Sequence, residues 1–188
     1  MNLLEIEAQY FDLHPQKSKN VAGQSLGSAA RVLEDATLAM NKRDWIVAGP
    51  RGQVVAALRG CNISNIDNGA KSYKVAPSSN SASNRALQAV GLALSSQRAV
   101  LCFLGAPALG QGGLFEALNI AGLQQLPIVF VIVSPNLSKM PLSHQVHSIV
   151  DVANSFQCEA MNIEKSEVTA KIQAFQKDPK PTVLNITL

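Results

Sequence analysis

The chain has 188 residues and a net charge of +3, and 47% of its residues are hydrophobic while only 5% are aromatic. This length fits a single domain over residues 1–188, and the aliphatic composition favours helices packed on a parallel sheet over an aromatic-rich all-β fold. The basic residues are scattered, which argues against nucleic acid as a partner, and no apolar run approaches the roughly 18 residues of a membrane span.

The cysteines indicate a reducing compartment. Cys61, Cys102 and Cys158 are far apart and odd in number, which is typical of reduced buried thiols rather than of a disulfide framework or a zinc site. The first eleven residues are acidic, and their apolar run is too short for a signal peptide. We therefore expect a cytoplasmic protein without membrane insertion.

The first half of the chain predicts short elements. In chain order we expect a helix at 1–11, a polar loop at 14–24 containing Pro15, a helix at 25–43 capped by Ser25, a strand at 45–48 and a brief helix at 54–58. Residues 61–83 are rich in Asn, Ser and Gly and show no periodicity. They predict a long loop, and loops of that length are either functional or disordered.

The second half has the order of a parallel α/β protein. We expect a helix at 84–97, a strand at 99–104, a Gly-rich turn, a helix at 114–126, a strand at 127–133, helices at 146–157 and 166–176, and a strand at 182–188. The first two strands are continuous apolar runs without alternation, which is typical of strands covered on both faces. The predicted fold is α/β, with helices on both faces of a parallel sheet.

The Gly-rich turn at 105–113 could present backbone N–H groups to an anion. It is not a P-loop, because Gln111 and Gly112 stand where that motif needs Lys and a hydroxyl residue. It is also a poor dinucleotide fingerprint, because Phe115 stands at the third glycine position, where helix and strand must pack closely.

Residues 101–133, with Gln111-Gly112, Glu116 to Asn119 and Leu126-Pro127 as the strongest matches, resemble the α subunit of the E1 component of 2-oxo acid dehydrogenases. The resemblance extends upstream to Asp44 and implies the fold of a thiamine diphosphate-binding module. It also implies that residues Gly105, Ala106, Pro107, Gln111 and Gly112 occupy the cofactor-binding positions.

The positions that hold magnesium in that family are changed here. The family ends its strand in Gly-Asp-Gly and the next strand in Asn-Asn, and the Asp and the second Asn bind the ion that bridges the diphosphate. In this chain Ala106 replaces the Asp and Pro135 replaces the second Asn, with Asn136 one position late. The resemblance therefore implies that both metal ligands are missing.

The residues themselves also argue against a bound diphosphate. A diphosphate brings several negative charges, and burying them requires a metal, cationic side chains or several aimed donors. Between residues 99 and 138 the only charged side chain is that of Glu116, and Pro107 removes a backbone donor. We expect no cofactor.

The region at 61–83 lacks the histidine that the resembled family places near its cofactor. The leading hypothesis is a degenerate, non-catalytic relative of the E1 α subunit that acts as an interaction or regulatory protein. The alternative is a minimal α subunit that uses thiamine diphosphate and magnesium with a β-like partner, with Asn136, backbone carbonyls and water around the metal. A third hypothesis is a small anion held by backbone donors at 110–113.

The predicted helix at 114–126 is apolar on nearly all sides, so it must be buried by this chain or by another. Its small residues would allow close helix approach. We therefore expect an oligomer, formed with further copies or with an E1 β-like subunit, through Phe115, Leu118, Ala121 and Gly122.

Overall fold

The computed structural model describes residues 1–20, 26–77, 79, 81–135, 146 and 148–188. Its centre is a five-stranded sheet in which every strand is parallel to its neighbours, in the order β1-β2-β3-β5-β4. The strands are β1 (Trp45–Val47), β2 (Val100–Gly105), β3 (Ile128–Ser134), β4 (Glu159–Asn162) and β5 (Thr182–Thr187).

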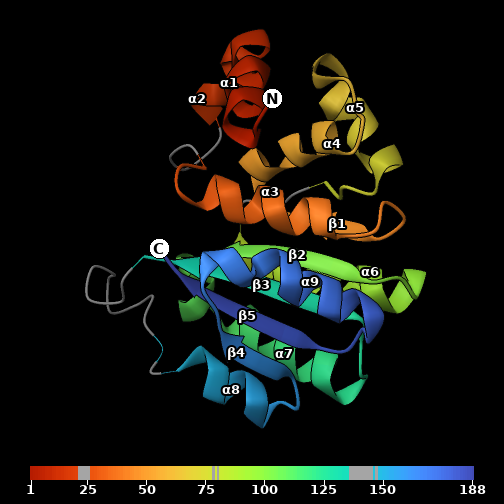
Figure 1. The fold of residues 1–188 in the computed structure, drawn as a ribbon, viewed down its shortest axis with the longest axis vertical. Coiled ribbons are helices and arrows are strands. Elements are labelled where there is room, and N and C mark those ends of the chain that lie inside the picture. The colour runs from red at the N-terminus through yellow and green to blue at the C-terminus, as the bar shows by residue number, and fades with distance from the viewer. Residues whose placement is uncertain (21–25, 78, 80, 136–145, 147) are drawn as a thin grey trace.

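Helices cover both faces of this sheet. They are α1 (Leu3–Leu13), α2 (Pro15–Asn20), α3 (Ala29–Ala39), α4 (Val55–Leu58), α5 (Ile66–Gly69), α6 (Ala82–Ser96), α7 (Gly112–Leu123), α8 (Ile149–Ser155) and α9 (Val168–Lys177). In Figure 1, α1, α2, α4 and α5 gather at the β1 end, whereas β4 and α8 lie at the opposite end. The predicted α/β architecture is confirmed.

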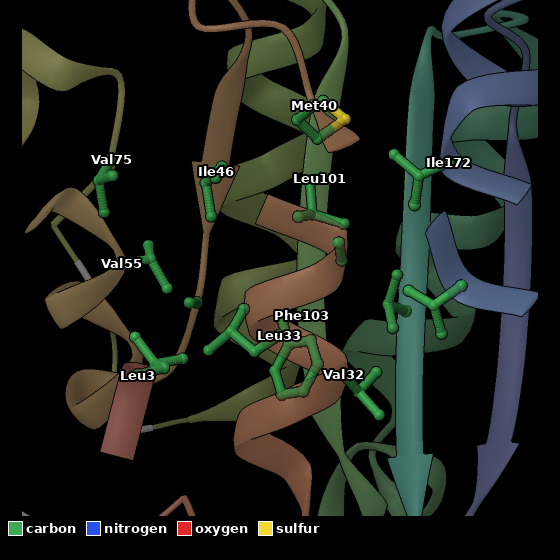
Figure 2. Close-up of a cluster of buried hydrophobic side chains, with 14 of the residues drawn as sticks. Leu3, Val32, Leu33, Met40, Ile46, Val55, Val75, Leu101, Phe103 and Ile172 are labelled. Carbon is green, nitrogen blue, oxygen red and sulfur yellow. The ribbon is translucent and has the colours of Figure 1, made fainter. Parts of the chain in front are cut away.

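The side chains of β2 alternate between two cores. Leu101 and Phe103 join a cluster built by α1, α3 and α9, and Figure 2 shows Leu33 of α3 against Phe103. Cys102 and Leu104 join the opposite cluster, which α6, α7 and α8 build. Because both faces of β2 and β3 are buried, their sequences are apolar throughout.

Local signals place several helix starts. Asn2 and Glu5 form a capping box at α1, and Ser81 and Ser148 cap α6 and α8 through their side chains. Within the described residues, no helix is long and apolar enough to cross a membrane.

The N-terminal half differs from expectation in three places. The polar segment at 14–24 contains α2, which begins at Pro15 because a first helical residue has no need of a backbone donor. The helix expected at 25–43 is shorter, and its expected cap, Ser25, lies outside the described residues. Residues 61–83 are not a continuous loop, because they contain three short helical turns and a bridge between Val75 and Ile46.

The C-terminal half contains one strand that the sequence pattern does not predict. Residues Glu159–Asn162 form β4 at the edge of the sheet, paired with β5. Both ends of this strand are exposed, so it has no apolar run that periodicity could detect.

Candidate functional site

The Gly-rich turn joins the carboxyl end of β2 to the amino end of α7. Gly105 ends the strand, residues Ala106–Gly110 form a 3-10 helix, and Gln111 is the N-cap residue of α7. The carboxyl edge of a parallel sheet is where α/β proteins usually bind ligands. The turn lies at this edge, between a strand and a helix as the sequence predicts.

The residues at the start of the turn offer no ligating side chain. Ala106 is only 8% exposed and belongs to the apolar cluster beneath α6 and α7. Pro107 is exposed and has no backbone N–H. Gly105 is half-buried, and a Cβ added there would lie 3.7 Å from the Cδ of Pro107, which is ordinary contact.

Gln111 connects two helix starts. Its Oε1 accepts a hydrogen bond of 2.9 Å from the backbone N–H of Ser83 at the beginning of α6. At Gly113, an added Cβ would lie 2.7 Å from the Cβ of Ser83, so this glycine lets α6 and α7 approach closely. Gly112 has nothing within 4 Å of an added Cβ. The observed role of Gln111 is to join the two helices.

The second of the two positions that bind magnesium in the resembled family lies just after β3. Ser134 is 3% exposed, and its carbonyl accepts a hydrogen bond of 2.9 Å from the N–H of Leu188. Pro135 follows as an exposed residue without a side-chain oxygen. Asn136, the substitute ligand of the alternative hypothesis, lies outside the described residues.

A buried arginine lies near this edge, and sequence reasoning missed it. The guanidinium of Arg85 is about 3.8 Å from a Cβ built on Gly49, just beyond β1, and it donates a 2.8 Å hydrogen bond to the carbonyl of Ser79. Burial lowers the pKa of Arg85. The side chain holds the segment before α6, and its signal was a lone charge in an otherwise small and apolar helix.

The structure also contains a cavity that the sequence did not indicate. A hollow of about 290 Å³ opens at the carboxyl ends of β3, β5 and β4, below the start of α8. It is lined by Leu109, Ser134, Val146, Ser148, Ile149, Asn162, Asn185 and Thr187. The amide of Asn185 donates a 2.7 Å hydrogen bond to Oδ1 of Asn162.

The residues expected at an oligomer interface lie mostly inside this chain. Leu118 and Ala121 are fully buried in the cluster beneath α7. Gly122 packs against the backbone of Phe156, whose carbonyl oxygen would be 1.7 Å from an added Cβ. Phe115 is only partly buried. Any partner contact through these four residues is therefore restricted to Phe115.

The three cysteines are free and are buried in the interior of the fold. Burial raises the pKa of Cys102 to about 12 and that of Cys158 to about 11, so both are protonated at neutral pH. In the part of the chain that the structure describes, no cluster of His, Cys, Asp or Glu could hold a metal ion.

Comparison with known proteins establishes the family. The family model described as "Dehydrogenase E1 component" matches residues 7–137, more than half of the chain. The chain belongs to the dehydrogenase E1 component family. No curated protein matches the sequence.

A solved structure from Mycobacterium smegmatis, a protein whose thiamin diphosphate dependence is inferred, shares the fold. It matches with a TM-score of 0.60 and 19% identity, over 89% of this chain and 33% of that chain. This chain therefore spans about a third of the length of that neighbour.

The described residues do not fit the cofactor that the resemblance implies. Magnesium binds oxygen ligands, and neither Ala106 nor Pro135 carries a side-chain oxygen. Ala106 is also part of the apolar core, so a carboxylate at its position would have to be accommodated among buried hydrophobic side chains.

Proposed function

We propose that this chain is a non-catalytic relative of the E1 α subunit that acts as an oligomeric interaction or regulatory protein. The observation that carries the proposal is the burial of Ala106 in the apolar cluster, at the position of the family's magnesium-binding Asp. The methyl group of Ala106 is buried in the hydrophobic core, where it stabilises the fold, and it has no atom that could bind a metal.

Electrostatics supports the same conclusion. A magnesium-free diphosphate needs compensating charge, because burying an unpaired anion is very costly. The charged side chain on α7 is that of the exposed Glu116, and the buried guanidinium of Arg85 near this edge already donates a hydrogen bond to the carbonyl of Ser79. Gln111, the polar side chain next to the turn, is already hydrogen-bonded to Ser83.

The interaction role rests on the outer surfaces of α6 and α7. Both helices return from the carboxyl to the amino edge of the sheet, and they contact each other at Ser83 and Gly113. Leu87 and Leu94 of α6 are 37% and 48% exposed, and Leu123 of α7 is 63% exposed. Exposed apolar side chains on neighbouring helices favour contact with a second copy or with a β-like subunit.

The alternative function is a minimal α subunit that decarboxylates 2-oxo acids with a β-like partner. The family match over residues 7–137 favours it. It requires Asn136, backbone carbonyls and water to hold the metal in place of Ala106 and Pro135. Binding of thiamine diphosphate separates the two proposals.

The test is calorimetric titration of the purified chain with thiamine diphosphate, with and without magnesium. We expect no saturable heat up to millimolar cofactor. A thiamine diphosphate enzyme with an intact Gly-Asp-Gly motif serves as the positive control. Magnesium-dependent saturation at micromolar thiamine diphosphate would contradict the proposal and support the α-subunit alternative.

A further inference from the structure

The side chains of three neighbouring strands, β3, β5 and β4, change from apolar to polar at the carboxyl ends of the strands. On the face covered by α7 and α8, the side chains of β3 run Phe130, Ile132 and Ser134, and those of β5 run Val183, Asn185 and Thr187. Because side chains alternate between faces, these residues share one face of the sheet. The core is therefore apolar until the last residues of each strand and then becomes polar.

Register brings the polar residues together. Ser134 is paired with Thr187, and Asn185 is paired with Asn162, which follows Ala160 on the same face of β4. A single polar residue at a strand end would be unremarkable. A row of hydroxyl and amide groups across three adjacent strands makes one continuous polar surface.

This surface is the floor of the cavity of about 290 Å³. Leu109 from the turn after β2 and Ile149 from α8 supply apolar walls, while Ser148 adds a third hydroxyl. The volume is just below the roughly 300–1,000 Å³ found for sites that bind drug-sized molecules, so the cavity fits a smaller ligand. The cavity also lies where β3 and β5 are neighbours. The chain leaves β3 for β4 at the edge of the sheet and then returns as β5 between them.

The polar groups have hydrogen-bonding capacity left over. The amide nitrogen of Asn185 is used by Asn162, and the amide oxygen Oδ1 of Asn185 is buried without a donor among the described residues. A buried acceptor without a partner is costly, so a donor from a ligand would stabilise it. The amide nitrogen of Asn162 offers donors next to it.

The polar side chains of the described lining indicate the class of ligand. Ser134, Ser148 and Thr187 carry hydroxyl groups, and Asn162 and Asn185 carry amides. An anion such as diphosphate supplies only acceptors and would leave the Asn185 oxygen unsatisfied. A hydroxyl group donates and accepts at once, so a molecule with several adjacent hydroxyls matches both asparagines and the three hydroxyl side chains.

We infer that the cavity at the carboxyl ends of β3, β5 and β4 is a binding site for a small polyhydroxy compound, with Asn185 and Asn162 as its central contacts. The site does not use the positions of the family's magnesium ligands. A negative result for this site would therefore leave the proposal that thiamine diphosphate is not bound unaffected, and the reverse also holds.

The test is a nuclear magnetic resonance titration of the isotope-labelled chain with glycerol, xylitol and D-glucose. We expect at least one of these polyols to shift the side-chain amide signals of Asn162 and Asn185 saturably at millimolar concentration. Pyrophosphate, titrated separately, should leave both signals in place. If no polyol produces a saturable shift, or if pyrophosphate saturates the same signals at a lower concentration, the inference is wrong.

Variants test the contacts themselves. Thr187→Val keeps the shape of the side chain and removes its hydroxyl, so we expect polyol affinity to fall by about threefold or more. Asn185→Leu should abolish saturable binding, while Asn68→Leu, on an exposed part of α5, should leave it unchanged. Unchanged polyol affinity in a folded Thr187→Val variant, together with unchanged affinity in Asn185→Leu, would show that the shifts arise elsewhere.

Discussion

Gly122 shows how closely α7 packs against the segment that follows α8. A Cβ added at this residue would lie 1.7 Å from the carbonyl oxygen of Phe156 and 2.9 Å from its carbonyl carbon. Both are backbone atoms, which cannot rotate away as the end of a side chain can. The glycine therefore fixes the distance between the helix and the turn that leads into β4.

Gly122→Ala is accordingly expected to lower the free energy of unfolding by about 3 kcal/mol or more, because the backbone of one segment must move. Gly91→Ala is the matched control in α6, where an added Cβ meets nothing within 4 Å. That substitution should raise stability by about 0.5–1 kcal/mol, since alanine is the better helix former. Urea denaturation of both variants measures the difference, and equal stabilities would contradict the packing described here.

The hydrophobic pattern of the sequence predicts the helices and strands that have strong periodicity or continuous apolar runs. The strands β2 and β3 and the helices α6 and α7 were expected within a few residues of their observed bounds. Short elements with weak patterns were missed, and β4 is the main example, because its stability comes from pairing with β5 rather than from its own sequence. Tertiary contacts, which no local pattern contains, also order the segment after Arg59.

Arg59 holds that segment against the start of β1. Its Nη1 donates hydrogen bonds to the carbonyls of Asp44 and Tyr73, at 2.7 and 3.1 Å, and its Nη2 donates to the carbonyl of Asn41 at 3.1 Å. Burial lowers its pKa to about 10, so the guanidinium stays charged at neutral pH. One side chain thus joins two separate pieces of backbone, residues 41–44 and Tyr73, to α4.

Arg59→Met should lower the free energy of unfolding by about 2–4 kcal/mol, because buried carbonyls lose charged donors. Hydrogen exchange should rise most in residues 61–75. Arg98→Met, at an exposed arginine, is the control and should change stability little. A folded Arg59→Met variant with wild-type stability and protection would show that the segment is held by its apolar contacts alone.

The candidate site also has one part that the sequence could predict and one part that it could not. The Gly-rich turn could be predicted because its glycines and flanking apolar runs are adjacent in the sequence. The cavity could not, because its floor comes from Ser134, Asn162 and Asn185, and one of these lies on the unpredicted strand β4. Only the strand order brings them together.

For the molecule as a whole, the exposed leucines of α6 and α7 predict self-association or a partner subunit. Sedimentation of the purified chain at micromolar concentration should show a species larger than a monomer. The double substitution Leu87→Glu and Leu94→Glu should shift it to monomer without lowering its melting temperature. Leu38→Glu, on α3 at the opposite face and 59% exposed, is the control. A wild-type chain that is monomeric throughout would remove the case for self-association and leave only a different partner subunit.

The sheet order has a consequence for synthesis on the ribosome. The described residues pair β4 with β5, and β5 also pairs with β3, so β5 fills the gap between two strands that are made before it. Until residue 187 leaves the exit tunnel, β3 has an open edge and β4 has no partner. Nascent chains in which β5 is still inside the tunnel should therefore expose an unpaired strand edge to chaperones, and chains in which β5 has emerged should not.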